Sequence, residues 1–95
     1  MAYALEYEVP ATPEIYGRVK AEVGDEPAKG MVSHLVVRQD HGLRHITVWD
    51  SREDWERFRD ERLQPAVGRV LVAAGMQAPP APPTRELQVV DVLTP

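Results

Sequence analysis

The stretch GLRHITVWDS, residues 42–51, decides the fold. It is rich in β-branched and aliphatic residues, which favours a strand ending at Trp49. Ser51 then begins a helix, because its hydroxyl can accept a hydrogen bond from a first-turn N–H, and Asp54 makes a weaker variant of the capping box. Apolar residues at helical spacing continue this helix to Gly75, and Pro65 inside it predicts a kink near Glu61.

The segment before this stretch predicts a hairpin partner. Residues 31–39 are again β-branched and aliphatic, and Asp40-His41-Gly42 supplies a turn between the two strands. If His41 and Gly42 form a two-residue turn, the residues on either side of it pair in order, starting with Asp40 and Leu43. The predicted pairs are His34 with Trp49, Val36 with Thr47, and Arg38 with His45.

This register separates polar from apolar side chains. On the other face of the hairpin, Leu35, Val37, Ile46 and Val48 make an apolar set. A slip of one residue would mix the two kinds on both faces. One face therefore carries His34, Arg38, His45, Thr47 and Trp49 together.

Three further elements are predicted at the two ends of the chain. Alternation over residues 2–9 predicts a strand, and Thr12 followed by Pro13 predicts a helix that ends at Gly24. A proline-rich connector over residues 78–83 leads to a last strand over residues 86–93.

The element order predicts one α+β domain over residues 1–95. Strand, helix, strand, strand, helix, strand is the ferredoxin-like βαββαβ plan, an antiparallel four-stranded sheet with two helices on one face. The other face of such a sheet needs a cover, and a second copy of the chain is the simplest one.

Composition excludes several classes of protein. The 95 residues hold 11 Lys and Arg against 15 Asp and Glu, a net charge of −4, which argues against nucleic-acid binding. With no Cys there is no disulfide scaffold, thiol nucleophile or cysteine metal site. No apolar run is long enough to cross a membrane, so we expect a cytoplasmic protein without membrane contact.

Two short motifs resemble one superfamily. A strand ending in VWDS, residues 48–51, followed by a charged helix with RLQPA, residues 62–66, is similar to the dimeric α/β-barrel superfamily. Antibiotic-biosynthesis monooxygenase-like proteins and small bacterial proteins of unknown function belong to it, and the latter look closest. The resemblance implies a homodimer of two sheets packed face to face, with the helices outside.

The resemblance also bears on cofactors. Trp49 matches the tryptophan that closes the third strand of the haem-degrading members, but Arg59 stands where their iron-ligating His lies. Two His without a third ligand in register fall short of a zinc set. We therefore expect no metal and no cofactor.

The polar face supplies the candidate site. His45 and His34 are the candidate catalytic residues, because a His can act as a general base near neutral pH. Candidate ligand contacts are Trp49, Arg38, Thr47 and Tyr7, which suit a flat, partly anionic molecule. The alternative is that these side chains only pack and hydrogen-bond across the dimer interface.

Two functions stay open at this point. The first is a small-molecule-binding dimer, which as an enzyme would resemble the cofactor-independent monooxygenases and act on an aromatic or hydrophobic metabolite. The second is a non-catalytic dimerisation or accessory domain without a ligand. A cavity reaching Trp49 and a His would favour the first function, and a filled interior the second.

Overall fold

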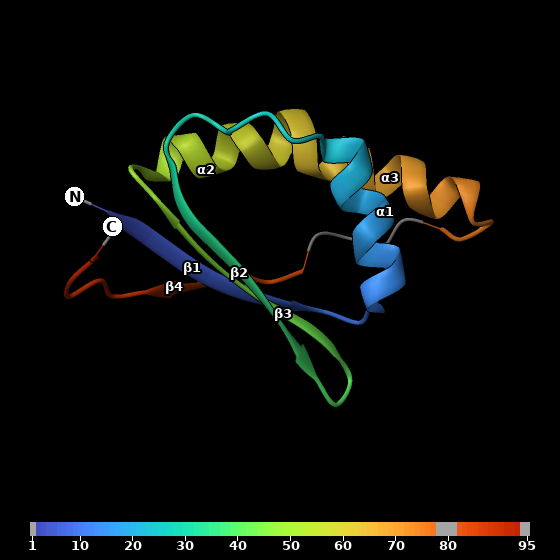
Figure 1. Cartoon of the computed structure of the whole chain (residues 1–95), viewed down its shortest axis with the longest axis horizontal. Coiled ribbons are helices and arrows are strands. Elements are labelled where there is room, and N and C mark those ends of the chain that lie inside the picture. Colours follow the sequence, from blue (N-terminus) through green and yellow to red (C-terminus); the bar gives the residue numbers. More distant parts are fainter. Residues whose placement is uncertain (1, 78–81, 94–95) are drawn as a thin grey trace.

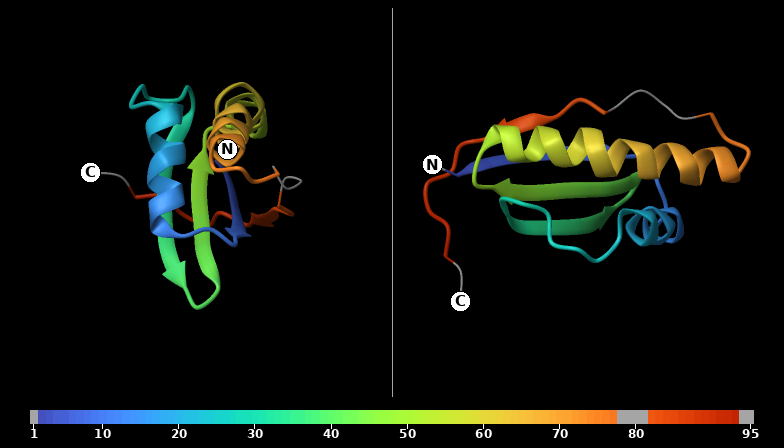
Figure 2. Two further views of the ribbon diagram at one scale, coloured as in Figure 1. Left: turned by 90° about the vertical axis from the view of Figure 1, so that its right-hand side faces the viewer. Right: turned by 90° about the horizontal axis from the view of Figure 1, so that it is seen from above.

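Four antiparallel strands form one sheet in the order β2-β3-β1-β4, and the helices lie on one face of it (Figures 1 and 2). The computed structural model describes residues 2–77 and 82–93. Its elements are β1 (Tyr3–Val9), α1 (Pro13–Val23), β2 (Met31–Gln39), β3 (Gly42–Trp49), α2 (Arg52–Phe58), η1 (Arg59–Leu63), α3 (Gln64–Ala73) and β4 (Arg85–Leu87). The predicted α+β ferredoxin-like order is confirmed.

Both predicted helix starts use the expected caps. The Thr12 hydroxyl accepts a hydrogen bond from the Ile15 N–H at 3.2 Å. The Ser51 hydroxyl accepts one from the Asp54 N–H at 3.2 Å and donates to the Asp54 carboxylate at 3.0 Å. The side chains named from the sequence thus begin α1 and α2.

Pro65 interrupts the regular α-helical hydrogen bonding of the second helix with a π-helical turn instead of the predicted kink. Residues 59–63 make a π-helical turn, η1, in which the Gln64 N–H donates to the Arg59 carbonyl. A proline ring clashes with the carbonyl four residues earlier, here Glu61, and a wider turn relieves that clash. The predicted position was right, but α2, η1 and α3 continue as one long helix (Figure 1).

The hairpin turn lies one residue earlier than predicted. Asp40 and His41 form it, and Gln39 pairs with Gly42. The observed pairs are His34 with Thr47, Val36 with His45, and Arg38 with Leu43, so the predicted pairs were wrong by two residues. Because side chains alternate with a period of two, this shift keeps every residue on its predicted face.

Gly42 explains the shift of the turn. Its φ is 141°, and a Cβ there would lie 2.2 Å from the Val9 carbonyl oxygen. The glycine therefore serves the close approach of β3 to the end of β1, and the turn falls on the two residues before it.

The last strand is shorter than predicted. Only Arg85–Leu87 pairs with β1, where Leu87 lies opposite Ala4. That antiparallel register leaves too little of β1 for the residues that follow, so the chain leaves the sheet after Leu87. Residues 78–81 of the predicted connector lie outside the described residues.

The two faces of the sheet differ in their cover. Leu5, Tyr7 and Trp49 point toward the helices and pack with Trp55 and Phe58 as the main core. We call the opposite side the helix-free face; Ala4, Leu35, Val37, Ile46 and Val48 lie on it, together with the charged Glu6, Glu8 and Arg44. Leu35 is 52 % exposed there. An exposed apolar side chain on an open sheet face is a candidate contact for a partner.

Candidate functional site

Four side chains from four elements meet beside α1: Tyr7 of β1, Tyr16 of α1, His34 of β2 and His45 of β3. We call them the histidine–tyrosine cluster. The His34 Nε2 and the His45 Nδ1 are 3.2 Å apart, a hydrogen bond. The Tyr7 ring stacks on His45 at 4.7 Å and 10°, and Tyr16 meets His45 edge-on at 5.4 Å.

Backbone pairing builds this cluster. Tyr7 and His45 are direct partners in the β1–β3 ladder, so their rings lie side by side on the helix-covered face. His34 is a diagonal neighbour of His45 in the β2–β3 ladder. Tyr16 comes from the first turns of α1, whose start Thr12 sets.

Burial keeps both histidines neutral at pH 7. It lowers the pKa of His45 to about 4, with a smaller contribution from His34. Partial burial of its ring, and then the positive charge of Lys20, lower the pKa of His34. Two neutral rings can share one N–H donor and one acceptor, which fits the observed hydrogen bond.

The tyrosines remain protonated. Burial, and then the neighbouring Tyr16, raise the pKa of the Tyr7 phenol. Burial also raises the pKa of Tyr16. The cluster therefore offers two phenol O–H groups and a neutral histidine pair. His45 is only 5 % exposed, whereas His34 lies open on edge strand β2.

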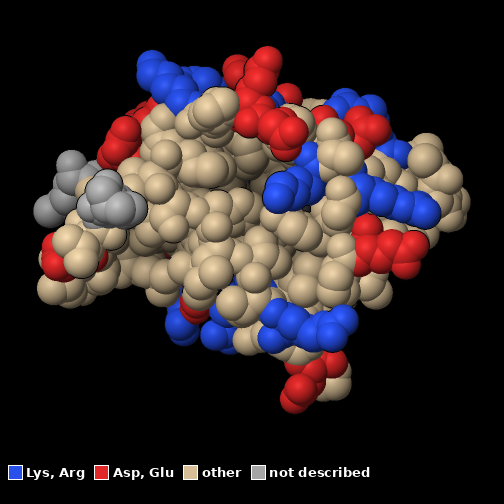
Figure 3. Space-filling view, viewed as in Figure 1, with Lys and Arg blue, Asp and Glu red and all other residues tan. Residues whose placement is uncertain are grey.

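This arrangement suits proton transfer from a ligand. A neutral imidazole at the open side can take a proton, and the hydrogen bond to the second ring, which stays neutral, holds the first ring in place. The surface seen in Figure 3 has an uncharged middle bordered by both basic and acidic side chains. The positive charge of Lys20, which acts on His34, favours a ligand that carries or develops negative charge.

Trp49 does not lie at an open rim. The indole is fully buried, with its centroid 5.2 Å from that of Phe58 and 5.8 Å from that of Trp55. Its Nε1 has no hydrogen-bond partner among the described residues. The cluster approaches this core through Tyr7, whose ring centroid is 5.8 Å from that of Trp55.

Two other predicted residues have no hydrogen bond to a member of the cluster. Thr47 is 2 % exposed, and its hydroxyl donates to the Ser33 carbonyl at 3.2 Å. Arg38 shares the face of His34 but is exposed further along β2, opposite Leu43. Of the six predicted site residues, the structure brings Tyr7, His34 and His45 together.

The expected dimer contact of this polar face does not fit the fold. The face that carries the histidines is turned toward the helices, and the apolar helix-free face is the open one. Tyr16 and Lys20 are the site residues absent from the sequence prediction. The available signal was their helical spacing of four after the Thr12 cap, which places them on neighbouring turns.

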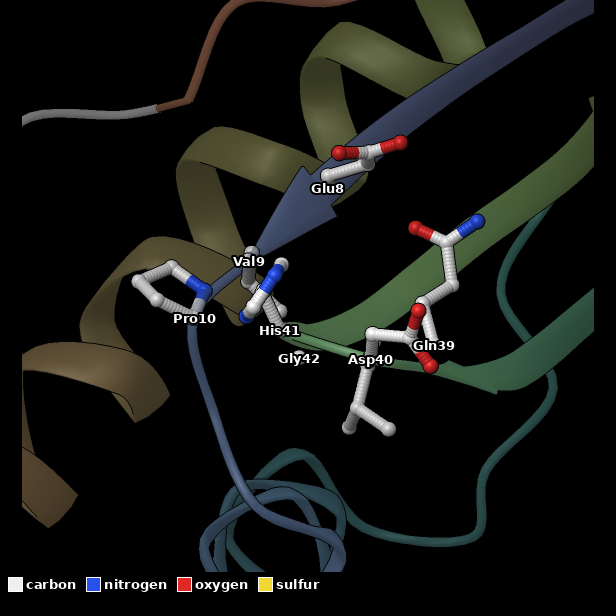
Figure 4. A pocket seen from close by; sticks show the side chains of 8 residues that line it. Glu8, Val9, Pro10, Gln39, Asp40, His41 and Gly42 are labelled. Carbon is white, nitrogen blue, oxygen red and sulfur yellow. The ribbon is translucent and has the colours of Figure 1, made fainter.

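Two surface hollows lie away from the cluster. One, of about 490 Å³, lies at the mouth of the hairpin, where Val9 and Pro10 meet His41 and Gly42 (Figure 4). The other, of about 570 Å³, lies along α3 and is lined by residues that include Pro65 and Val72. Neither contains a residue of the histidine–tyrosine cluster.

The described part of the chain has neither a metal-binding group of side chains nor a membrane-spanning helix. Within residues 2–77 and 82–93, no three His, Cys, Asp or Glu side chains are grouped to hold a metal ion. In the same residues, no helix has the length and apolar character required to span a membrane.

The fold is shared with several solved structures. A protein described as an antibiotic biosynthesis monooxygenase from Chloroflexus aurantiacus aligns with a TM-score of 0.65 and 19 % identity, over 99 % of this chain and 98 % of that one. Rv0793 from Mycobacterium tuberculosis aligns with a TM-score of 0.58 and 13 % identity, over 99 % and 100 %.

A third similar structure has a named activity. SnoaB, a cofactor-independent oxygenase from Streptomyces nogalater, aligns with a TM-score of 0.54 and 18 % identity, over 97 % of this chain and 94 % of that one. No protein-family model and no curated protein sequence matches the chain. At these identities the likeness supports the resemblance to antibiotic biosynthesis monooxygenase-like proteins at the level of the fold.

Proposed function

We propose that the chain, which has the fold of the antibiotic biosynthesis monooxygenase-like structures, is a small-molecule-binding homodimer acting on an aromatic or hydrophobic metabolite. Its activity is of the cofactor-independent monooxygenase type. The observation that carries the proposal is the neutral His34–His45 pair held between two tyrosines. Monooxygenation without a cofactor needs an electron-rich substrate anion, and this pair can accept the proton whose removal creates it.

Each member of the cluster has a role in this proposal. His34 lies open on β2 and takes the proton, while His45 holds the His34 ring in place. Tyr7 and Tyr16 orient His45 and offer phenol O–H groups to the ligand. The positive charge of Lys20, which acts on His34, stabilises a ligand anion formed beside it.

The homodimer follows from the helix-free face. Leu35 is half exposed there, beside Val37, Ile46 and Val48. A two-fold dimer would bury the same apolar patch of both copies and leave the histidine–tyrosine cluster of each copy on its helix side.

Ligand-induced stabilisation tests the proposed site. We would measure the thermal shift with a panel of phenols, naphthols and aromatic carboxylates, since a ligand at 100 times its Kd stabilises by about 2.7 kcal/mol. A bound phenol should stabilise the parent chain and lose most of that effect in His34→Gln. His41→Gln, at the exposed hairpin tip, is the matched control and should respond as the parent does.

A reaction assay then separates binding from catalysis. Any phenol or naphthol that shifts the melting temperature should also cause oxygen uptake with the parent chain, and His34→Gln should abolish that uptake. Oxygen uptake that persists in His34→Gln would contradict the assigned proton acceptor. Binding without oxygen uptake would leave a ligand-binding protein and refute the oxygenase activity.

One observation favours the second candidate function, a non-catalytic dimerisation or accessory domain. Trp49, the expected ligand platform, is fully buried against Trp55 and Phe58. A filled interior at this position is what a domain without a ligand would have. A dimer that shows no thermal shift with any member of the panel would support this second function.

A further inference from the structure

The connection between α1 and β2 lies against one side of the main core. We call residues 24–30 the cover loop, and Figures 1 and 2 show it running beside the long helix. Ala28 is half-buried and packs against the main core, whereas residues 24–27 and Lys29 are exposed. The loop is therefore held closed by little apolar contact, and segments of this kind open at a low cost in free energy.

Arg62 of η1 supplies a polar contact that holds the loop. Its Nη2 donates to the Val23 carbonyl at 3.0 Å and to the Glu26 carbonyl at 2.9 Å. The guanidinium carbon lies 5.4 Å from the centroid of the Phe58 ring, which belongs to the main core. One side chain thus joins the long helix, the core and the cover loop. Because water can replace both hydrogen bonds, this contact can be released.

The two ends of the cover loop differ in how firmly they are held. Gly24 ends α1 with a φ of 89°, and a Cβ placed on it would meet no described atom within 4 Å. Its backbone direction is therefore not fixed by packing. At the other end, the Gly30 carbonyl accepts a hydrogen bond from the Asp50 N–H at 2.7 Å, directly after β3. A free end and a fixed end suit a loop that swings about Gly24.

The side of the core beside the loop contains an unpaired donor. Met31 follows the cover loop directly, packs against the main core and pairs with Trp49 across the β2–β3 ladder. Trp49 is fully buried, and its Nε1 has no hydrogen-bond partner among the described residues. A buried N–H without an acceptor destabilises the closed arrangement. An open loop would let water, or an oxygen of a bound molecule, reach that N–H.

We infer that the cover loop opens locally while the rest of the chain stays folded, and that Arg62 is its latch. Opening admits a planar aromatic molecule with an acceptor oxygen to the side of the core that holds Trp49. This entry route rests on the small-molecule binding proposed above, whereas the opening itself does not. A closed state with a filled interior and an open state that binds a ligand are two populations of one chain.

Acrylamide quenching of tryptophan fluorescence tests the opening, because both tryptophans lie in the main core. Arg62→Gln removes the Nη2 donor and should raise the quenching constant at least about twofold. Arg69→Gln is the matched control. Arg69 also links the long helix to α1, through Glu22 at 3.0 Å, but neither residue belongs to the cover loop. This variant should quench as the parent does.

A second variant and a mild denaturant separate local opening from a weakened fold. Ala28→Asp puts a charge at the apolar contact of the loop and should raise the quenching constant as well. Local opening exposes little surface, so the raised quenching should stay nearly constant up to about 1 M urea. Quenching that climbs with urea would assign Arg62 to global stability alone. Parent-like quenching in both Arg62→Gln and Ala28→Asp would show that the loop does not open.

Stopped-flow binding of 2-naphthol tests the entry route. Its association rate should rise at least about threefold in Arg62→Gln, since more molecules are open, and should be unchanged in Arg69→Gln. Parent-like association in Arg62→Gln would overturn the entry route even if quenching rises. If neither 2-naphthol nor any other compound of the thermal-shift panel binds, the proposed small-molecule binding and the entry route both fail, and the quenching result still decides the opening.

Discussion

His45 combines burial, stacking and a hydrogen bond in one side chain. It is 5 % exposed, stacks on Tyr7 and is bonded to His34 through its Nδ1. Each of these contacts is compatible with a neutral ring, and a proton on His45 would have to be buried among aromatic side chains. The state of this residue therefore couples the fold to pH.

The first prediction concerns that coupling. The pKa of His45 is about 4 in the folded chain and 6.5 as the ordinary value, so the unfolded chain binds the proton more readily. The stability due to neutral His45 is complete above pH 6.5 and is lost as the pH falls toward 4, by roughly 3 kcal/mol. In His45→Phe, the loss of unfolding free energy between these pH values should be smaller by about this amount.

Urea unfolding at pH 7 and pH 4.5 measures this difference. His41→Gln provides the control, because that residue lies at the hairpin tip outside the cluster. The groups facing His45 are Tyr7, Tyr16 and His34, and the two tyrosines do not titrate in this range. An unchanged pH dependence in His45→Phe would show that the ring is not held neutral by its surroundings.

The second prediction concerns Trp49. Its side chain is fully buried among aromatic rings, so Trp49→Ala should lower the unfolding free energy by about 3–5 kcal/mol, the usual cost of truncating a buried aromatic residue. Chemical denaturation measures this loss. A cost below about 1 kcal/mol, together with loss of a ligand-induced thermal shift, would restore Trp49 as a ligand contact rather than a core residue.

At the scale of the elements, the hairpin and β1 are joined by a backbone contact at Gly42. A Cβ there would lie 2.2 Å from the Val9 carbonyl oxygen, and its φ of 141° disfavours any other residue. Gly17 in α1 has open space around the same position. A side chain is therefore excluded at Gly42 by the neighbouring backbone, whereas Gly17 has room for one.

The third prediction compares these two glycines. Gly42→Ala should destabilise the chain by about 2 kcal/mol or more, because the contact involves backbone that cannot turn away. Gly17→Ala should stabilise it by about 0.5–1 kcal/mol, the difference between the two residues inside a helix. Thermal or urea unfolding of both variants checks the pair. Equal effects would mean that β1 and β3 do not approach as closely as described.

At the scale of the whole molecule, the two faces of the sheet carry different kinds of side chain. The helix-covered face holds the main core and the histidine–tyrosine cluster. The helix-free face holds apolar side chains that the described chain covers only in part, and Leu35 is the most exposed of them. A chain of 95 residues buries a modest share of its surface, and a second copy would cover this face.

The fourth prediction tests that face directly. Leu35→Asp should raise the fraction of monomer at micromolar concentration, because it places a charge in the apolar centre of the proposed interface. Light scattering should then return a mass close to 10.7 kDa instead of twice that value. The side chain is 52 % exposed in the single copy, so the fold itself should persist. A Leu35→Asp chain that remains fully dimeric would place the interface elsewhere.

The sequence by itself determined the element order, both helix starts and the face on which each strand residue lies. These features depend on local chemistry: a hydroxyl beside the first helical turn, and an alternation of side chains that survives a shift of two residues. His34, His45 and Tyr7 could therefore be placed on one face before any tertiary contact was known.

Only the tertiary structure decided the register, the burial of Trp49 and the end of the last strand. The register depends on the approach of Gly42 to Val9, which are far apart in sequence. Trp49 is buried because α2 brings Trp55 and Phe58 over it. The last strand ends at Leu87 because Leu87 pairs with Ala4, close to the first residue of β1, so that few residues of β1 remain for further pairing. Each of these outcomes depends on contacts between distant segments, which local pattern and propensity do not specify.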